Sequence, residues 1–351
     1  MAVASVSRRL KTGIVGCGNI APAHAEALAT LPQSEFWACC DTDPTKATML
    51  ASRHGAPHVS TSLGEFLASG VEAVMVCTPH KSHEAVVTRA AEAGVHVLCE
   101  KPISVELEQA DRMIAAADSA GITFGVVFMR RFWPAAQRIK KAIESGQIGV
   151  PTMGMCQSLL WRPESYFAQA EWRGTWAGEG GGVLMNQAVH VIDMLQWFMG
   201  PVMEVYGKSA TLVHGNYIDV EDTVSATITF ASGGLGIVQA ISTIEPAYGY
   251  RVTVHGSKGH TLSVWENPEG NQGYNDIWTL DSSGELRARW EAEERASPGF
   301  PGFHKLQIAD FLQAVIDARP PAVTGAEGRK SIAIIQAIYE SSRTGQPVQF
   351  T

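Results

Sequence analysis

The sequence contains no apolar run that approaches the roughly 20 residues needed to span a bilayer, and it contains no long basic stretch. The formal net charge of −8 leaves no electrostatic footprint for nucleic acid or for an anionic membrane surface. We therefore expect neither as a partner. The composition is that of an ordinary globular chain, and 351 residues suffice for one large or two modest domains.

Cysteine is scarce, and no two cysteines form a Cys-x-x-Cys pair or a zinc-like cluster. The sequence predicts no metal site and a reducing, cytoplasmic location. Arg8 and Arg9 look like part of an export signal, but no separate apolar region or cleavage site follows them. We expect a short lead-in to the first strand instead.

The pattern up to residue 128 alternates strands and helices. Apolar runs predict strands at Leu10–Val15, Glu35–Cys40, Ala73–Cys77, His96–Cys99 and Thr123–Val127. Alanine-rich stretches such as His83–Ala93 and Glu106–Ala120 predict helices between them. Continuous apolar strands that alternate with helices are typical of a parallel sheet covered on both faces. Residues 8–128 are therefore predicted to form a doubly wound Rossmann domain.

After a helix near Trp133–Ser145 the pattern changes, and residues 129–351 are predicted to form a second, α+β domain. Alternating strands are expected at Val224–Phe230, Leu235–Ser242 and Arg251–His255, in a mostly antiparallel sheet. Helices are expected at Val183–Met199, His304–Ala318 and Gly328–Thr344, and loops at 266–274 and 295–302.

A glycine-rich turn follows the first strand and opens a helix, in the segment Gly16-Cys17-Gly18-Asn19-Ile20-Ala21. Gly16 permits the turn, Gly18 lets the backbone approach a pyrophosphate, and the helix N-terminus favours negative charge. Asp41 ends the second strand, about 20 positions further on, where a carboxylate can accept the ribose hydroxyls and repel a 2′-phosphate. The competing acid, Asp43, is expected to begin the next helix. The alternative is a glycine turn with no ligand.

Two further groups of polar residues close predicted strands. Glu100-Lys101-Pro102 follows His96–Cys99, and Thr78-Pro79-His80, with His83 nearby, follows Ala73–Cys77. Open α/β sheets bind ligands at the carboxyl ends of their strands. Each group alone could be a solvated strand end, but together they favour a ligand site.

The predicted helix Val183–Met199 follows three glycines, Gly180 to Gly182, and is apolar almost all round, so it should be buried. Asn186, His190 and Asp193 form a polar stripe on it. These side chains must satisfy one another or face a wet cleft, since unpaired buried polar groups cost about 1–3 kcal/mol each. A self-satisfied core pair of His190 and Asp193 is the alternative, and Asp193 could serve only to orient His190.

Aromatic residues and arginines cluster in Trp161–Phe167 and Trp172–Trp176. Such clusters suit stacking on sugar rings, but they equally suit a core or an oligomer surface. Tyr166 and Arg173 are the expected ligand contacts.

Together these residues resemble the glucose–fructose oxidoreductase/inositol dehydrogenase/MocA (Gfo/Idh/MocA) family, over nearly the whole chain. The most specific part is Glu100-Lys101-Pro102 combined with the glycines and His190-x-x-Asp193. The segment from His304 to Phe311 and the ending from Thr344 to Val348 are also similar. The resemblance implies a C-terminal α/β domain with an open sheet that forms a homodimer or homotetramer interface. It also implies that Lys101 and His190 are catalytic and that Pro102 follows a cis peptide.

This sequence departs from inositol dehydrogenases in having Asn186 where they usually have aspartate. A branch with nucleotide-sugar and pyranose dehydrogenases is similar to it in this respect. We therefore expect an NAD-dependent dehydrogenase, with NADP disfavoured, acting on a ring secondary alcohol of a sugar or cyclitol. Nucleotide-sugar and inositol dehydrogenases remain alternatives, as does a non-catalytic dinucleotide-binding transcriptional regulator.

His190 is expected to take the alcohol proton and Lys101 to stabilise the alkoxide, with the reverse assignment open. The absence of a strong basic cluster favours an uncharged or weakly charged polyol. Expected cofactor contacts are Gly16, Gly18, Asn19, Ile20, Asp41, Thr78, Pro79, His80, His83, Glu100, Lys101, Arg173 and Trp176. Expected substrate contacts are Lys101, Arg162, Tyr166, Trp172, Asn186, His190 and His304.

Overall fold

The computed structural model describes residues 8–266, 273–295, 299 and 301–350. The predicted loop positions 267–272, 296–298 and 300 lie outside the described residues. The chain forms two compact units, Met1–Met129 with Pro301–Arg329 and Arg130–Phe300 with Lys330–Thr351. The segment Pro301–Arg329, which the sequence analysis assigned to the second domain, therefore packs in the first unit.

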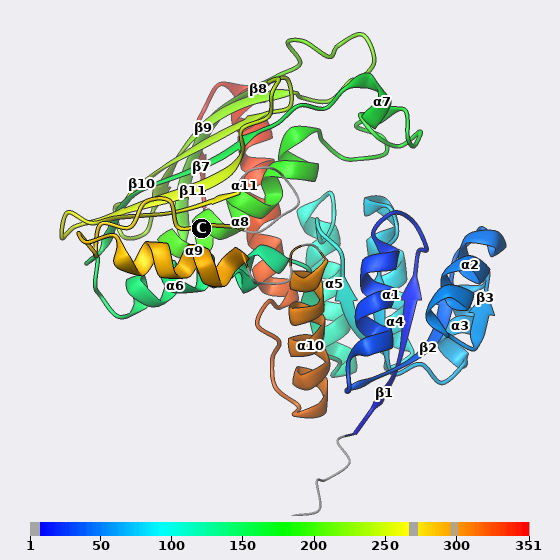
Figure 1. The fold of residues 1–351 in the computed structure, drawn as a ribbon. Coiled ribbons are helices and arrows are strands. Elements are labelled where there is room, and N and C mark those ends of the chain that lie inside the picture. The colour runs from blue at the N-terminus through cyan, green and yellow to red at the C-terminus, as the bar shows by residue number, and fades with distance from the viewer. Residues whose placement is uncertain (1–7, 267–272, 296–298, 300, 351) are drawn as a thin grey trace, which may run out of the picture. The chain divides into compact units, whose positions relative to one another are not determined.

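The first unit contains a six-stranded parallel sheet with the spatial order β3-β2-β1-β4-β5-β6, of which Figure 1 labels β3, β2 and β1. Its strands are β1 (Leu10–Val15), β2 (Ser34–Cys40), β3 (His58–Ser60), β4 (Ala73–Val76), β5 (His96–Cys99) and β6 (Phe124–Val126). The order reverses between β1 and β4, and this switch point is where open α/β sheets bind ligands. The predicted Rossmann sheet is confirmed.

Helices connect the parallel strands of this sheet. They are α1 (Ala21–Thr30), α2 (Pro44–His54), α3 (Leu63–Ala68), α4 (His83–Glu92) and α5 (Leu107–Ala120). A further helix of this unit, α10 (Gly302–Ile316), comes from much later in the chain. As predicted, Asp43 begins α2, because its carboxylate accepts the backbone N–H of Thr45 at 2.9 Å. Helix α10 belongs to this unit because Ile308 and Phe311 are buried in one apolar core with Ile14.

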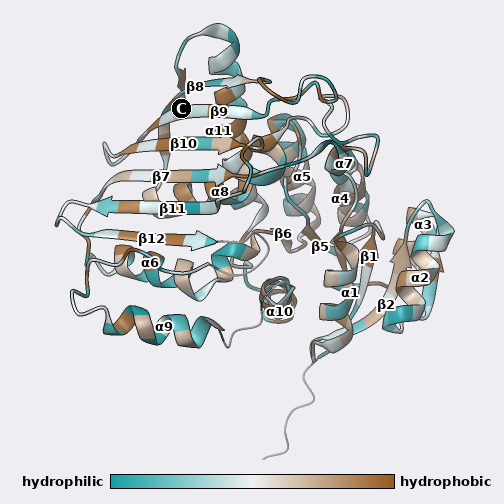
Figure 2. Ribbon diagram, turned by 45° about the horizontal axis from the view of Figure 1, so that its top comes forward, coloured by the Kyte–Doolittle hydropathy of each residue, from teal (hydrophilic) through white to brown (hydrophobic). Residues whose placement is uncertain are grey.

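The second unit contains a seven-stranded sheet with the order β12-β11-β7-β10-β9-β8-β13, which Figure 2 shows from β8 to β12. Only the pair β7–β10 is parallel. Its strands are β7 (Pro151–Leu159), β8 (Val202–Ala210), β9 (Thr223–Phe230), β10 (Leu235–Ile241), β11 (Gly249–Gly256), β12 (Thr261–Glu266) and β13 (Val348–Gln349). The mostly antiparallel character of this sheet is confirmed.

Helices of the second unit cover one face of its sheet. They are α6 (Pro134–Glu144), α8 (Val189–Met199), α9 (Glu285–Arg295) and α11 (Gly325–Thr344), whose first residues belong to the first unit. The short helix α7 (Glu164–Phe167) lies apart from them (Figure 1). Gly154 of β7 faces α8, since a Cβ there would lie 2.7 Å from a side-chain methyl of Leu195. Gly207 of β8 donates its backbone N–H to Ser341 of α11 at 3.0 Å. No helix in the described part of the chain has the length and apolar character needed to cross a membrane.

The helix predicted at Val183–Met199 is present, but its first turn, Leu184–Ala188, is a π-helix, and α8 follows it. The carboxylate of Glu221 accepts the backbone N–H groups of Gly182 and Leu184 at 2.8 and 2.9 Å. A side chain thus anchors the start of the helix.

Candidate active site

A tight turn joins β1 to α1 in the first unit. Gly16 has a φ of +90°, and a Cβ there would lie 2.7 Å from the backbone carbon of Cys77, so both conformation and space require glycine. Gly18, in contrast, has no heavy atom within 4 Å of the position that a Cβ would take. Open space therefore borders the backbone where the sequence motif predicts a pyrophosphate.

The carboxylate of Asp41 at the end of β2 is fixed against this turn. One oxygen accepts the backbone N–H of Cys17 at 2.6 Å, and the other accepts that of Asp43 at 2.8 Å. These bonds leave lone pairs on both oxygens for a further donor. The acid predicted to face a ribose is thus held beside the glycine turn, although it lies 24 residues from Cys17.

The segment after β4 carries the second predicted group. The Thr78 hydroxyl oxygen is buried and has no hydrogen-bond partner in the described part of the protein. His80 is buried in a short 3-10 helix, His80–Ser82. The ring of His83 lies with Nε2 2.9 Å from the carbonyl oxygen of Thr78 and Nδ1 2.9 Å from that of Pro102. Burial lowers the pKa of His83. The His83 ring therefore braces the backbone after β4 and β5 rather than facing open space.

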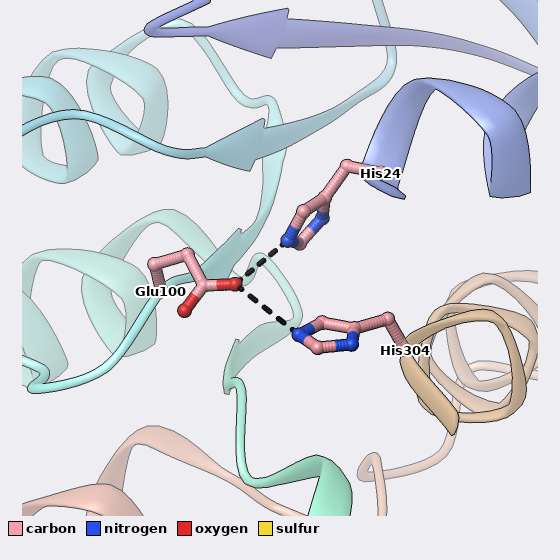
Figure 3. Close-up of side chains that lie close together, drawn as sticks. All are labelled: His24, Glu100 and His304. Atoms are coloured by element: carbon pink, nitrogen blue, oxygen red, sulfur yellow. Dashed lines mark hydrogen bonds and ion pairs between the residues drawn. The ribbon is translucent and has the colours of Figure 1, made fainter. Parts of the chain in front are cut away.

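Glu100 and Lys101 follow β5 directly. Glu100 is buried, and one of its oxygens lies 2.7 Å from Nε2 of His24 on α1 (Figure 3). Its other oxygen accepts the backbone N–H of Lys101 at 3.2 Å. The Lys101–Pro102 peptide is cis, which confirms the expectation from the family resemblance. His304, predicted as a substrate contact, lies on α10 of the same unit, buried beside Glu100.

The glycines before the π-turn of the second unit are explained by close packing. A Cβ on Gly182 would lie 2.0 Å from the carbonyl oxygen of Glu221. A Cβ on Gly181 would lie 2.2 Å from the hydroxyl oxygen of Tyr339, and this hydroxyl donates to the Glu221 carboxylate at 3.0 Å. The triple glycine that the sequence analysis associated with a ligand site thus lets this segment pack closely against the backbone of Glu221 and the side chain of Tyr339.

The polar stripe of the second unit divides into separate contacts. Both oxygens of Asp193 accept from the guanidinium of Arg131, at 2.6 and 2.8 Å, which is a bidentate buried ion pair. Asn186 donates its amide to the carboxylate of Glu179 and, at 3.3 Å, to the hydroxyl of Tyr166. His190 lies on α8 with 6% of its surface exposed. Asp193, which was expected to pair with or orient His190, thus has a charged partner, Arg131, that the sequence analysis did not consider.

Tyr166 is the centre of a polar cluster in this unit. Its hydroxyl oxygen receives Arg173 at 2.5 Å, Gln187 at 3.0 Å and Asn186 at 3.3 Å. The guanidinium carbons of Arg162 and Arg173 lie 4.9 and 4.5 Å from the centre of its ring. Three N–H donors and two cations around one phenol make this part of the unit electropositive.

The two predicted tryptophans lie at different distances from this cluster. Trp172 is joined to it by Arg173, whose guanidinium carbon lies 4.9 Å from the indole ring centre. Trp176 is 44% exposed, and its backbone and indole N–H groups both donate to Asp219 at 2.8 Å. Those bonds hold the Trp176 ring within its own unit.

The sequence analysis missed three buried side chains that fix this geometry, His24, Glu179 and Glu221, and the partly buried Tyr339. Glu179 accepts the backbone N–H of Gly174 at 2.7 Å as well as the amide of Asn186. Burial raises the pKa of Glu221 to about 7, against the opposing effect of its hydrogen bonds. An acidic residue directly before the three glycines was the only signal that could have indicated Glu179.

The first unit fits a dinucleotide on three observations. Open space borders Gly18, the Asp41 carboxylate is fixed beside it, and the buried Thr78 hydroxyl lacks a partner in the described residues. Gly16 and Thr78 meet at the carboxyl ends of β1 and β4, on either side of the switch point. Fold and site together define an oxidoreductase with an NAD-binding Rossmann domain and a separate C-terminal α/β domain.

Comparison with known proteins identifies the family. Residues 10–128 match "Oxidoreductase family, NAD-binding Rossmann fold", and residues 140–350 match "Oxidoreductase family, C-terminal alpha/beta domain". The chain belongs to the Gfo/Idh/MocA family of oxidoreductases.

Relatives resemble this chain over nearly its whole length. The myo-inositol 2-dehydrogenase of Thermotoga maritima is 27% identical over 339 residues, which cover 95% of this chain and 96% of that enzyme. The WlbA dehydrogenase of Bordetella pertussis, solved with NADH and UDP-GlcNAcA, is 31% identical, covers 99% of both chains and gives a TM-score of 0.89. GenD2 from gentamicin A biosynthesis, solved with NAD, is 25% identical over 100% of this chain and 99% of that one, with a TM-score of 0.81.

Proposed function

We propose that this protein oxidises, or in reverse forms, a secondary alcohol on the ring of a sugar or cyclitol, with NAD as the hydride carrier. The observation that carries the proposal is the turn between β1 and α1, where open space at Gly18 adjoins the fixed carboxylate of Asp41. Relatives that are named inositol dehydrogenases and a relative solved with a sugar nucleotide support the substrate class.

NAD is the preferred cofactor in this proposal. The Asp41 carboxylate is placed to accept ribose hydroxyls and to repel a 2′-phosphate. Lys46, a nearby cation, lies 3.8 Å from Asp43 and is engaged there. Steady-state kinetics with both cofactors tests this preference, and an equal or better kcat/KM with NADP would overturn it.

The chain's own residues handle the proton. When bound, NAD supplies the hydride acceptor. His190 accepts the proton of the substrate hydroxyl, because an imidazole is a suitable base near neutral pH. Lys101 donates a hydrogen bond to the same oxygen and stabilises its developing negative charge. In the reverse assignment Lys101 is the base and His190 donates the hydrogen bond. That assignment predicts a pH–rate profile whose lower limb follows the titration of an amine rather than of an imidazole.

A sugar that carries an acidic group, alone or linked to a nucleotide, is the second candidate substrate. The expectation of an uncharged polyol depended on the absence of a basic cluster, yet Arg162 and Arg173 both lie within 5 Å of the Tyr166 ring centre. Guanidinium groups recognise carboxylates and phosphates well. The similar WlbA dehydrogenase was solved with UDP-GlcNAcA, which favours the same class.

The open face of the seven-stranded sheet is the proposed oligomer interface. Leu235 of β10 and Met153 of β7 lie opposite each other on it and are 57% and 38% exposed. Ile237 and Met155 form the next pair on the same face of the sheet, two residues along each strand, so apolar side chains are adjacent across the two strands. A second copy of the chain would bury this face in a dimer or tetramer. Light scattering measures the oligomer, and a monomer for the wild type would contradict the proposal.

The test of function is a substrate panel assayed by nicotinamide absorbance. It contains neutral sugars, cyclitols, uronic acids and nucleotide sugars with and without a carboxylate, each with NAD and NADP. Turnover of ring alcohols supports the proposal, and preference for acidic members favours the second candidate. Binding of NADH with no turnover of any member would favour a non-catalytic regulator, although this chain has both Lys101 and His190.

A further inference from the structure

Two buried histidines of the first unit, His24 and His304, converge on one carboxylate oxygen of the buried Glu100 (Figure 3). Nε2 of His24, on α1, lies 2.7 Å from Oε1 of Glu100, which follows β5. Nε2 of His304, on α10, lies 4.0 Å from the same oxygen. The two imidazole rings meet edge to face, with 5.7 Å between their centres. One helix that starts at the dinucleotide turn, one strand end and one distant helix therefore meet at Glu100.

Glu100 is an anion in this environment. Burial by itself would raise the pKa of its carboxyl, but the hydrogen bond from His24, together with nearby positive charge such as that of Lys101, lowers it to about 2. The buried thiols nearby, Cys77 and Cys99, stay neutral because burial raises their pKa. The protein thus maintains one negative charge at the carboxyl end of β5, where an isolated buried carboxylate would take up a proton.

A metal ion is the other occupant that two histidines and a glutamate could hold. The contacts argue against it. The 2.7 Å separation of His24 and Glu100 is that of a hydrogen bond. A metal-bound histidine normally donates its second nitrogen to a partner, and Nδ1 of His24 is buried with no partner among the residues described. An unprotonated Nδ1 suits that position better, since unpaired buried N–H groups are rare.

We propose that His24 and His304 are positioning residues that hold Glu100 as an anion, and that this anion makes the first unit bind NAD⁺ in preference to NADH. The inference depends on the proposed function, because it requires a nicotinamide cofactor at the carboxyl ends of β1, β4 and β5. The nicotinamide ring is positively charged in NAD⁺ and neutral in NADH. A fixed negative charge in a poorly solvated site therefore stabilises the oxidised cofactor selectively.

The experiment measures the dissociation constants of NAD⁺ and NADH for the full chain by calorimetry at pH 7.5, without substrate. E100Q should raise the Kd of NAD⁺ by about tenfold and change that of NADH much less. E100D, which keeps the charge, should retain most of the preference. E26Q is the matched control, because it removes one exposed charge from the same helix as His24 and should leave the ratio unchanged.

Variants of the histidines test the positioning role. H24L removes the donor and should move the ratio of the two constants toward that of E100Q, whereas H24Q keeps a donor and should move it less. H304Q should act in the same direction as H24L, so these variants decide the matter if E100Q fails to fold. Equal weakening of both cofactors in every variant would overturn the proposal and leave a merely structural cluster.

Three other outcomes also overturn the proposal, and they can be distinguished from one another. If the wild type binds neither cofactor, the proposed function fails and this inference fails with it. If both cofactors bind but the wild type releases stoichiometric zinc to a chelator and H24L contains none, the cluster is a metal site. An unchanged ratio in E100Q, with tight binding of both cofactors, defeats this inference alone.

Discussion

Replacing Asn186 with aspartate distinguishes two interpretations of the polar stripe in the second unit. From the sequence, a carboxylate there would pair with a protonated His190 and favour the imidazolium. In the structure the Asn186 amide instead donates to the carboxylate of Glu179 and to the hydroxyl of Tyr166. The substitution N186D therefore removes a donor and places two carboxyl groups in contact.

The expected loss of stability depends on pH. A hydrogen bond to a charged group contributes about 1.5–3 kcal/mol, and this contribution is lost wherever no shared proton between the two carboxyl groups replaces the bond. Two carboxyl groups in contact cannot both ionise freely, so the pKa of the pair rises above that of the unfolded chain. The folded variant then binds more protons than the unfolded one, and its stability falls as pH rises through the raised pKa. We expect a loss of about 1 kcal/mol at pH 5, where a shared proton restores a bond, and about 3–4 kcal/mol at pH 8.

The assay is urea unfolding of the wild type and N186D at pH 5, 6.5 and 8. N186A is one control, since it removes the donor without adding a charge and should lose stability equally at each pH. The double variant N186D/E179Q is the matched rescue. The new glutamine can donate to the new carboxylate and still accept the backbone N–H of Gly174, which Glu179 accepts at 2.7 Å in the wild type.

The rescue also isolates His190. In N186D/E179Q the donor and the acceptor have exchanged positions, so the new carboxylate still receives a hydrogen bond. Any effect of that carboxylate on the His190 imidazolium is then seen in the lower limb of the pH–rate profile, which should shift upward. A pH-independent loss in N186D, or a double variant no more stable than N186D, would show that Asn186 does not face Glu179. The reasoning from the hydrogen bonds would then be wrong.

Three further predictions use other parts of the site. K101A and H190A should each lower kcat by roughly 10²–10⁴ with little change in the Kd of NADH, measured by titration. If turnover and NADH affinity were lost together, these residues would support the fold rather than the chemistry. G16A should fail to fold, because glycine is required there by φ and by space, whereas G18A should keep the wild-type Tm and weaken NAD⁺ binding, since a methyl group would fill the open space. Burial raises the pKa of Glu221 to about 7 in the folded state, so this group should cost the wild type on the order of 3 kcal/mol as pH rises from about 5 to 8. E221Q should reduce this dependence in urea unfolding without abolishing it, because burial also raises the pKa of Glu294 to about 7; a wild type equally stable at both pH values would contradict the argument.

The sequence predicted the Rossmann sheet because its strands are continuous apolar runs. All five predicted strands are present, with ends within one residue of those expected. The strand β3 was missed because its three residues, His58–Ser60, are mostly exposed and carry no apolar pattern. Helix α10 was predicted, but not the unit it joins. Ile308 and Phe311 fit any apolar core, and only the folded chain shows which core receives them.

The candidate sites of the two units differ in how far they could be predicted. Gly16, Gly18 and Asp41 are local signals, because a turn and the acid at the next strand end are coupled by the βαβ unit. The contacts of Asn186 were not local signals. Its partner Glu179 has no pattern that marks it as buried. Similarly, nothing near Glu221 predicts that it anchors the start of a helix 37 residues earlier in the chain.

Three buried glutamates, Glu100, Glu179 and Glu221, each support a residue to which we assign a role in catalysis or binding. Glu100 accepts from the backbone of Lys101, Glu179 accepts from Asn186, and Glu221 holds the turn that leads to His190. Removing one partner of a buried charge is strongly destabilising, because the remaining charge is left uncompensated. Substitutions in this site will therefore change the fold and the chemistry together. A kinetic effect can be assigned to chemistry only when a variant that preserves the donor, as E179Q does for N186D, restores stability while the effect persists.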